Sequence, residues 1–223
     1  RSGPDRSGAG RSAAQRRRRG REAPRAEHVL DGGRRAEHRV GERVWSIPVT
    51  GFWQAHRSAP AAYARTVAEF VASSARPDPH VCWDLYGGAG VFAGALADTT
   101  GAAEIHIVDS AAAALAAADD VFADDQRVRT HGGEVAAVIP DLPSPDVVIL
   151  DPPRTGAGER VIDRIVAAGP EVVVHVGCDI ARFARDLALF TARGYRVTTL
   201  RAFDAFPLTH HVEVIAALTR VDS

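Results

Sequence analysis

Between residues 81 and 218 the chain alternates between short apolar runs typical of β-strands and longer Ala- and Leu-rich stretches of helical length. Strands that alternate with helices predict a mostly parallel sheet covered by helices on both faces. The strands are expected at 81–85, 104–108, 127–130, 146–150, 171–176, 195–201 and 211–218, and the helices at 91–97, 110–123, 158–168 and 180–193.

The last two apolar runs, 195–201 and 211–218, leave no room for a helix between them, so they are expected to pair antiparallel through the loop 202–210. A parallel sheet that ends in an antiparallel hairpin is the arrangement of the class I methyltransferase fold. The predicted fold class is therefore α/β and Rossmann-like. Ahead of the sheet, 44–49 is expected to be a strand and 59–74 a helix, whose buried face carries Tyr63, Val67, Phe70 and Val71.

The composition divides the chain near residue 40. Residues 1–39 carry 12 arginines against 5 acids and almost no apolar periodicity, and every basic residue of the chain is Arg. We expect 1–39 to be a disordered or poorly packed tail and 40–223 to be one folded domain. For the arginines at 16–19 three interpretations stay open: a solvated tail or remnant, a contact with RNA phosphates, or a transit peptide that lacks an apolar face.

Composition also excludes several classes of protein. No apolar stretch approaches the roughly 20 residues that span a bilayer, and no signal-peptide core opens the chain, so we expect a cytoplasmic protein without a membrane partner. Cys82 and Cys178 are too few for a disulfide framework or an iron–sulfur cluster. Cys82, inside an expected strand, is interpreted as a core residue. The pair His210 and His211 is not expected to bind metal, because adjacent residues of an extended run face opposite ways.

A glycine-rich turn follows the first strand of the expected sheet. Residues 84–90 read Asp-Leu-Tyr-Gly-Gly-Ala-Gly, and Asp109 ends the next strand, where an acid can bind ribose hydroxyls. Glycines such as Gly88 let the backbone pass close to a ligand beside a helix N-terminus. Nicotinamide-binding proteins share this pattern, but the spacing is not Gly-x-Gly-x-x-Gly, which favours S-adenosyl-L-methionine. A tight turn without a ligand stays open as an alternative.

Chemically reactive side chains follow other strands of this sheet. Asp151 and Arg154 come after one strand, Cys178 comes after the next, and Glu213 opens the last apolar run. Ligands of open α/β sheets bind at the carboxyl ends of the strands, so we expect these four side chains to meet at one edge. A thiol beside a carboxylate is interpreted there as a nucleophile with a general base.

Six short segments follow one another along the chain: Phe52-Trp53-Gln54, Asp84-Leu85-Tyr86-Gly87-Gly88-Ala89-Gly90, Asp151-Pro152-Pro153-Arg154, Gly177-Cys178-Asp179, Ala184-Arg185-Asp186-Leu187 and Phe203 to Glu213. In this order they resemble the RNA uracil-5-methyltransferase family, whose members make 5-methyluridine in tRNA and ribosomal RNA. Each segment alone is a weak signal, and the order of all six carries the resemblance.

The resemblance implies a role for each reactive residue. Cys178 corresponds to the nucleophile that adds to carbon 6 of uracil, and Glu213 to the base that removes the proton from carbon 5. Asp151 and Arg154 are expected to help hold the target base and the cysteine loop, and Arg154 to lower the pKa of the thiol. Because the target carbon lies on a base edge, the uridine must be unpaired or flipped out. Phe52, Trp53 and Phe206 are the aromatic residues considered for stacking on it.

The resemblance also implies the methyl donor S-adenosyl-L-methionine, and an RNA partner that is tRNA or ribosomal RNA. Gln54, Tyr86, Asp109 and Asp151 match positions that contact the donor, with Gly88 in the glycine turn. Arg185 and Asp186, on an expected helix, are interpreted as structural support for the cysteine loop.

Several features depart from the family. Its members usually carry an N-terminal RNA-binding barrel and a central domain, which are missing from this sequence, as are the cluster-binding cysteines of some members. The segment Gly177-Cys178-Asp179-Ile180 replaces the commoner Ser-Cys-Asn-Pro, and Gly132-Gly133-Glu134 lacks the usual acid at its second position, for which Glu134 is a substitute. A fragment or degenerate copy is thus one interpretation.

Three other functions were weighed. Amino-methylating enzymes of the Asp-Pro-Pro-Tyr type need an aromatic residue where this chain has Arg154. RNA 5-methylcytosine enzymes place a cysteine in the fourth-strand motif, which has none here. The third is a non-catalytic S-adenosylmethionine-binding module, against which the presence of both Cys178 and Glu213 argues.

Overall fold

The computed structural model describes residues 31–74, 79–209 and 211–221. The arginines at 16–19 and His210 therefore lie outside the described residues. Contacts divide the chain into a unit that ends at Gly33 and a unit that begins at Arg34. Everything below concerns the second unit.

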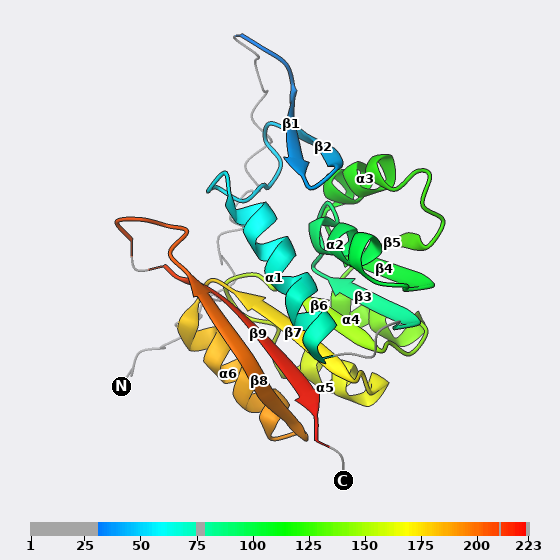
Figure 1. Ribbon diagram of the computed structural model, residues 1–223, viewed down its shortest axis with the longest axis vertical. Helices are drawn as coiled ribbons and strands as arrows, with labels where there is room; N and C mark the ends of the chain where they lie inside the picture. The colour runs from blue at the N-terminus through cyan, green and yellow to red at the C-terminus, as the bar shows by residue number, and fades with distance from the viewer. Residues whose placement is uncertain (1–30, 75–78, 210, 222–223) are drawn as a thin grey trace, which may run out of the picture. The chain divides into compact units, whose positions relative to one another are not determined.

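The main sheet comprises, among the described residues, β3 (Val81–Leu85), β4 (Glu104–Asp109), β5 (Val128–Gly132), β6 (Val147–Leu150), β7 (Val172–Gly177), β8 (Tyr195–Phe203) and β9 (Glu213–Arg220). Its strand order is β5-β4-β3-β6-β7-β9-β8 (Figure 1). The first five strands in this order are parallel, whereas β9 runs antiparallel to both β7 and β8. The predicted α/β class and its C-terminal antiparallel hairpin are confirmed.

Helices cover both faces of the sheet: α1 (Ala59–Ser74), α2 (Val91–Thr99), α3 (Ala112–Val121), α4 (Val135–Val138), α5 (Glu159–Ala168) and α6 (Ile180–Thr191). α1, α2 and α3 pack on one face, and α4, α5 and α6 on the other (Figure 1). Alternate residues of β3 explain this division, because Cys82 belongs to the first core and Trp83 to the second. The interpretation of Cys82 as a core residue is confirmed, since its side chain is fully buried.

A two-stranded hairpin precedes α1, and its first strand was not predicted. β1 (Arg35–Val40) pairs antiparallel with β2 (Arg43–Pro48), so the expected tail boundary at residue 39 is wrong for residues 35–39. β1 was missed because its sequence is polar and its residues are at most half-buried. Trp45 of β2 is buried, and its Nε1 donates to the carbonyl of Ala89 at 2.7 Å, which ties the hairpin to the glycine turn.

The segment between β5 and β6 holds a further difference. It contains the short helix α4 and a 3₁₀ turn at Ile139–Asp141, neither of which the pattern predicted. In the part of the chain that the structure describes, no helix is long and apolar enough to cross a membrane.

Candidate active site

The predicted site residues lie at the edge of the sheet where its parallel strands end. Tyr86 follows β3, Asp109 is the last residue of β4, Asp151 follows β6 and Cys178 follows β7. Glu213 is the first residue of β9, which runs in the opposite direction, so it starts at the edge where β7 ends. The topology therefore brings the thiol and the carboxyls together, as expected from the order of the strands.

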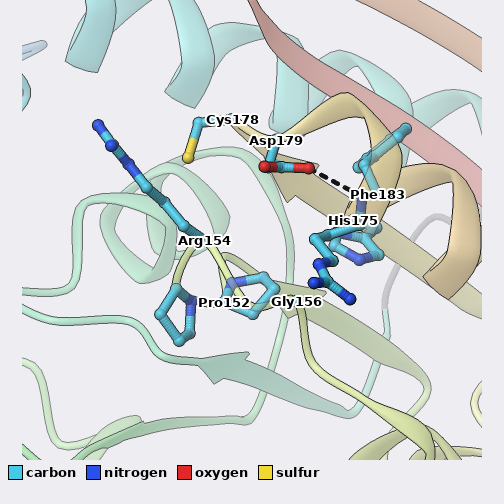
Figure 2. Close-up of a pocket in the computed structure, with 10 residues that line it drawn as sticks. Pro152, Arg154, Gly156, His175, Cys178, Asp179 and Phe183 are labelled. Carbon is cyan, nitrogen blue, oxygen red and sulfur yellow. Dashed lines mark hydrogen bonds between the residues drawn. The ribbon is translucent and has the colours of Figure 1, made fainter. Parts of the chain in front are cut away.

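Cys178 is a half-buried free thiol at the junction of β7 and α6. A Cβ atom on Gly177 would lie 2.8 Å from Cδ2 of Phe183, so only glycine lets α6 start this close to the strand. Asp179 caps α6 by accepting a hydrogen bond from the Arg182 amide at 2.9 Å. A small pocket lies here, and Figure 2 shows the Cys178 sulfur on the same side of it as the Arg154 side chain.

The charges around the thiol act in opposite directions. Burial raises the pKa of Cys178, and the carboxyls of Glu213 and Asp151 raise it further, whereas the guanidinium of Arg154 lowers it. The net shift is upward. The hypothesis that Arg154 lowers the pKa of this thiol is thus right for its own contribution and wrong for the sum. The sequence missed this because it gives no measure of burial or of how close two carboxyls lie.

Glu213 and Asp151 form a pair of carboxyls next to the thiol. The Glu213 side chain is 3% exposed. Burial and then the charge of Asp151 raise the pKa of Glu213 to about 7. Burial likewise raises the pKa of Asp151 to about 7. A carboxyl with a pKa near neutrality can accept and release a proton at physiological pH, which a general base requires.

The loop after β6 is braced by Asp186 of α6. This carboxylate is fully buried and accepts hydrogen bonds from the Ala157 amide and the Arg185 guanidinium, each at 2.7 Å. His175 approaches it at 3.4 Å, and Arg185 also donates to the Thr155 carbonyl at 3.0 Å. Burial opposes ionisation of Asp186, but these hydrogen bonds outweigh it and lower its pKa to about 2. Arg185 and Asp186 are therefore structural, and they hold the 151–158 loop against the cysteine strand.

The glycine turn after β3 is shaped for a ligand on one side and packed on the other. Gly88 has a φ of +54°, and its amide donates to Oδ2 of Asp109 at 2.9 Å. A Cβ atom on Gly88 would meet no atom closer than that same Oδ2 at 4.0 Å, so this side of the turn is open. Gly90 has a φ of +79°, and a Cβ atom there would lie 2.7 Å from Cδ1 of Ile107.

Asp84 is a functional residue that was quoted in the motif but not counted among the site residues. Its side chain is fully buried at the end of β3, and its Oδ2 accepts from the Ala93 amide at 2.9 Å. Its Oδ1 has no hydrogen-bond partner among the described residues. Burial raises the pKa of Asp84 to about 7. A buried carboxylate oxygen without a partner, beside an open glycine turn, fits a ligand that brings a positive charge or a hydrogen-bond donor.

Tyr86 and the segment after β2 complete the predicted ligand side. Tyr86 is half-buried with a φ of +60°, and burial, followed by the charges of Asp186 and Glu134, raises its pKa to about 12. Gln54 is half-buried and Phe52 is 81% exposed.

The three aromatic candidates for base stacking differ in their surroundings. Trp53 stacks on His38 of β1 with ring centroids 4.4 Å apart and lies beside Trp45. Phe206 is half-buried beside His211. Phe52 therefore is the one of the three that is largely exposed. Within the described ranges, no cluster of three or more His, Cys, Asp and Glu side chains is arranged to hold a metal ion.

Comparisons with known proteins point in one direction. No family model matches the chain. It is 45% identical over 206 residues to an uncharacterised RNA methyltransferase of Corynebacterium efficiens, covering 91% of this chain and 48% of that protein. It is 40% identical over 195 residues to an uncharacterised RNA methyltransferase of Streptomyces avermitilis, covering 86% of this chain and 44% of that protein. The chain thus spans about half the length of the curated relatives it matches.

Solved structures show the same fold. The Pyrococcus abyssi tRNA (uracil-54, C5)-methyltransferase in complex with S-adenosyl-L-homocysteine superposes with a TM-score of 0.71 at 27% identity, over 84% of this chain and 45% of that one. The precorrin-6y C5,15-methyltransferase of Geobacter metallireducens gives a TM-score of 0.58 at 17% identity, over 70% of this chain and 88% of that one. The predicted class I methyltransferase fold is confirmed.

Proposed function

We propose that this chain is the catalytic domain of an RNA methyltransferase, which transfers a methyl group from S-adenosyl-L-methionine to carbon 5 of a uridine through a covalent cysteine adduct. The observation that carries the proposal is the grouping of the Cys178 thiol with the Glu213 and Asp151 carboxyls at one edge of the sheet. The names of the relatives support RNA methylation. The Pyrococcus abyssi enzyme supports uracil carbon 5 as the target.

The residues at the glycine turn fit S-adenosyl-L-methionine. Asp109 ends β4, where a carboxylate can accept hydrogen bonds from ribose hydroxyls, and the open side of Gly88 allows close approach of the ligand. The unpartnered Oδ1 of Asp84 suits the donor's cationic groups. Gln54 and Tyr86 are proposed to border the same site. When bound, S-adenosyl-L-methionine supplies an electrophilic methyl group.

The reaction needs a nucleophile because carbon 5 of uracil is too weak to attack a methyl group unaided. The Cys178 sulfur forms a bond to carbon 6, which places electron density on carbon 5. Once carbon 5 carries the methyl group, the Glu213 carboxylate takes its remaining proton. The electrons of that C–H bond restore the double bond between carbons 5 and 6, and the bond from carbon 6 to sulfur breaks, which returns Cys178.

The electrostatics assign separate tasks to the neighbouring charges. The reaction needs Cys178 as a thiolate, yet ionised Glu213 and Asp151 hinder its ionisation. Arg154 opposes them, and it is the cation among the groups that act on the thiol. We therefore assign to Arg154 the stabilisation of the thiolate, and to Asp151 the placement of the base together with the elevation of the pKa of Glu213.

Phe52 is the residue that we propose to stack on the extruded uridine, because it is the largely exposed member of the aromatic set. The position after the two prolines is Arg154, so the geometry offers no aromatic plane there for amino methylation. A non-catalytic module is not favoured, because the relatives are named as methyltransferases.

A methyl-transfer assay tests the proposed function. Purified protein is incubated with methyl-labelled S-adenosyl-L-methionine and unmodified tRNA or ribosomal RNA transcripts, and the RNA is digested to nucleosides. Label in 5-methyluridine is expected, and label in a methylated adenosine, guanosine or cytidine would contradict the assignment of carbon 5 of uridine. The same assay with Arg154→Ala should give less product, because the thiolate loses its neighbouring cation.

A further inference from the structure

Tyr63 carries a hydroxyl that the packing of its helix does not explain. It lies on α1 with Val67, Phe70 and Val71, and these side chains are all buried in one apolar core. A phenylalanine would fill the same space. The Tyr63 side chain is 1% exposed, and its hydroxyl has no hydrogen-bond partner among the described residues. Buried polar groups are nearly always paired, so this hydroxyl needs an explanation.

The position of the ring points to the partner. Tyr63 packs edge-on against Phe203 of β8, with ring centroids 5.0 Å apart. Phe203 is the cross-strand partner of Glu213 in the β8–β9 ladder. Tyr63 therefore covers the start of β9, where the proposed base is located.

The charges around the hydroxyl are those of the proposed active site. Burial raises the pKa of Tyr63, and the charges of Glu213, Asp151 and Cys178 raise it further, in that order. The hydroxyl thus stays protonated at physiological pH and acts as a hydrogen-bond donor. Because Tyr63 comes from α1, Asp151 from the loop after β6 and Cys178 from the loop after β7, these three groups approach Glu213 from three different elements.

We propose that Tyr63 is a positioning residue whose hydroxyl donates a hydrogen bond to the ionised carboxylate of Glu213 during the reaction. This inference rests on the proposed function, in which Glu213 removes the proton from carbon 5. In that step the proton moves to the carboxylate, its bonding electrons restore the double bond and the carbon–sulfur bond breaks. Tyr63 keeps its own proton throughout and holds the carboxylate in the ionised form that can accept one.

A matched pair of variants tests the inference. Tyr63→Phe removes the hydroxyl and little else. Tyr195→Phe is the control, because Tyr195 is 2% exposed and its hydroxyl donates to the Pro170 carbonyl at 2.7 Å, at the other end of the sheet. Both variants are incubated with S-adenosyl-L-methionine and uridine-containing RNA across a range of pH. Release of product and the covalent protein–RNA adduct on denaturing gels are measured together.

Tyr63→Phe is expected to slow product release at pH 7 about tenfold or more and to accumulate the adduct, since adduct formation does not use Glu213. Loss of a donor to the carboxylate raises the pKa of Glu213, so the acid limb of the pH–rate profile should move to higher pH, with activity recovering as the pH rises. Tyr195→Phe should keep the wild-type profile. An unchanged profile in Tyr63→Phe, or an effect confined to the KM for S-adenosyl-L-methionine, would overturn the inference.

A second measurement does not depend on activity. Unfolding free energies are compared at pH 5 and pH 9 for wild type, Tyr63→Phe, Glu213→Gln and the double variant. Tyr63→Phe should cost more at pH 9, where Glu213 is ionised, and this pH dependence should vanish in the Glu213→Gln background. An equal cost at both pH values would refute the contact. If wild type forms no adduct with any RNA, the proposed function fails, and the unfolding cycle still decides the role of Tyr63.

Discussion

Cys178 and Glu213 lie at the same end of two antiparallel strands: Cys178 directly follows β7, Glu213 opens β9, and the pairing of Gly177 with Val214 fixes their register. The charge of Glu213 raises the pKa of the thiol. A one-residue slip in this ladder would turn the Glu213 side chain to the opposite face of the sheet. The antiparallel hairpin is thus what brings a base to the nucleophile in an otherwise parallel sheet.

The two cysteines should respond differently to substitution. Cys178→Ala removes the proposed nucleophile and is expected to reduce methyl transfer by at least ~10³-fold, while the unfolding midpoint stays near that of wild type. Cys82→Ala, in the core of β3, should lower stability by about 1 kcal/mol and leave the rate largely intact. Rates and urea unfolding curves measure both. Full activity in Cys178→Ala would rule out a cysteine adduct.

The buried carboxyls make stability fall as the pH rises. The pKa of Glu213 in the folded chain is about 7, against the model value of 4.5. Its protonated form therefore contributes stability that is complete below pH 4.5 and is lost as the pH rises through 7. Glu213→Gln should reduce the difference in unfolding free energy between pH 5 and pH 8.5 by up to roughly 3 kcal/mol. Denaturant titrations at the two pH values measure it, and an unreduced difference would show that Glu213 is not the titrating group.

Loss of Asp186 should release the loop that carries Asp151 and Arg154. Asp186→Ala leaves the Ala157 amide and the Arg185 guanidinium without an acceptor and should cost roughly 3 kcal/mol together with most of the activity. Asp163→Ala removes an ion pair with Arg193 on the surface and should cost less than about 1 kcal/mol. Thermal unfolding compares the two variants. Equal costs would mean that Asp186 does not brace the loop.

Two glycines of the same turn should separate stability from ligand binding. Gly90→Ala puts a Cβ atom 2.7 Å from Ile107 and 2.8 Å from Phe122 and should cost about 2 kcal/mol or more of stability. Gly88→Ala faces open space and should cost about 1 kcal/mol, chiefly through its φ of +54°. Calorimetry should nevertheless show that Gly88→Ala weakens S-adenosyl-L-methionine binding at least tenfold. Unimpaired binding by Gly88→Ala would remove this side of the turn from the proposed site.

The sequence predicted the parts of the fold that follow from hydrophobic pattern. Near-continuous apolar runs such as Val172–Val176 must be buried on both faces, which indicates a covered parallel sheet. The order of the runs then placed Asp109, Asp151, Cys178 and Glu213 at one edge. The polar strand β1 carried no such pattern, because pairing with β2 and packing of Trp45, not apolar residues of its own, define it.

What the sequence did not provide was the surroundings of single side chains. Tyr63 reads as one more member of an apolar helix face, and only the tertiary structure shows that its hydroxyl is buried without a partner next to Glu213. Asp84 reads as the first residue of a motif, and its unpartnered oxygen is likewise a tertiary fact. The net shift in the pKa of Cys178 depends on burial, which no motif records.

The most direct test of the account is to trap the adduct with RNA in which 5-fluorouridine replaces uridine. Fluorine on carbon 5 cannot be removed as a proton, so the bond between Cys178 and carbon 6 should persist after methyl transfer. We predict a protein–RNA species that survives denaturing electrophoresis, requires S-adenosyl-L-methionine, forms with Cys82→Ala and is absent with Cys178→Ser. Methylation of uridine in unmodified RNA without any such species, or a species that persists in Cys178→Ser, would contradict the covalent cysteine mechanism.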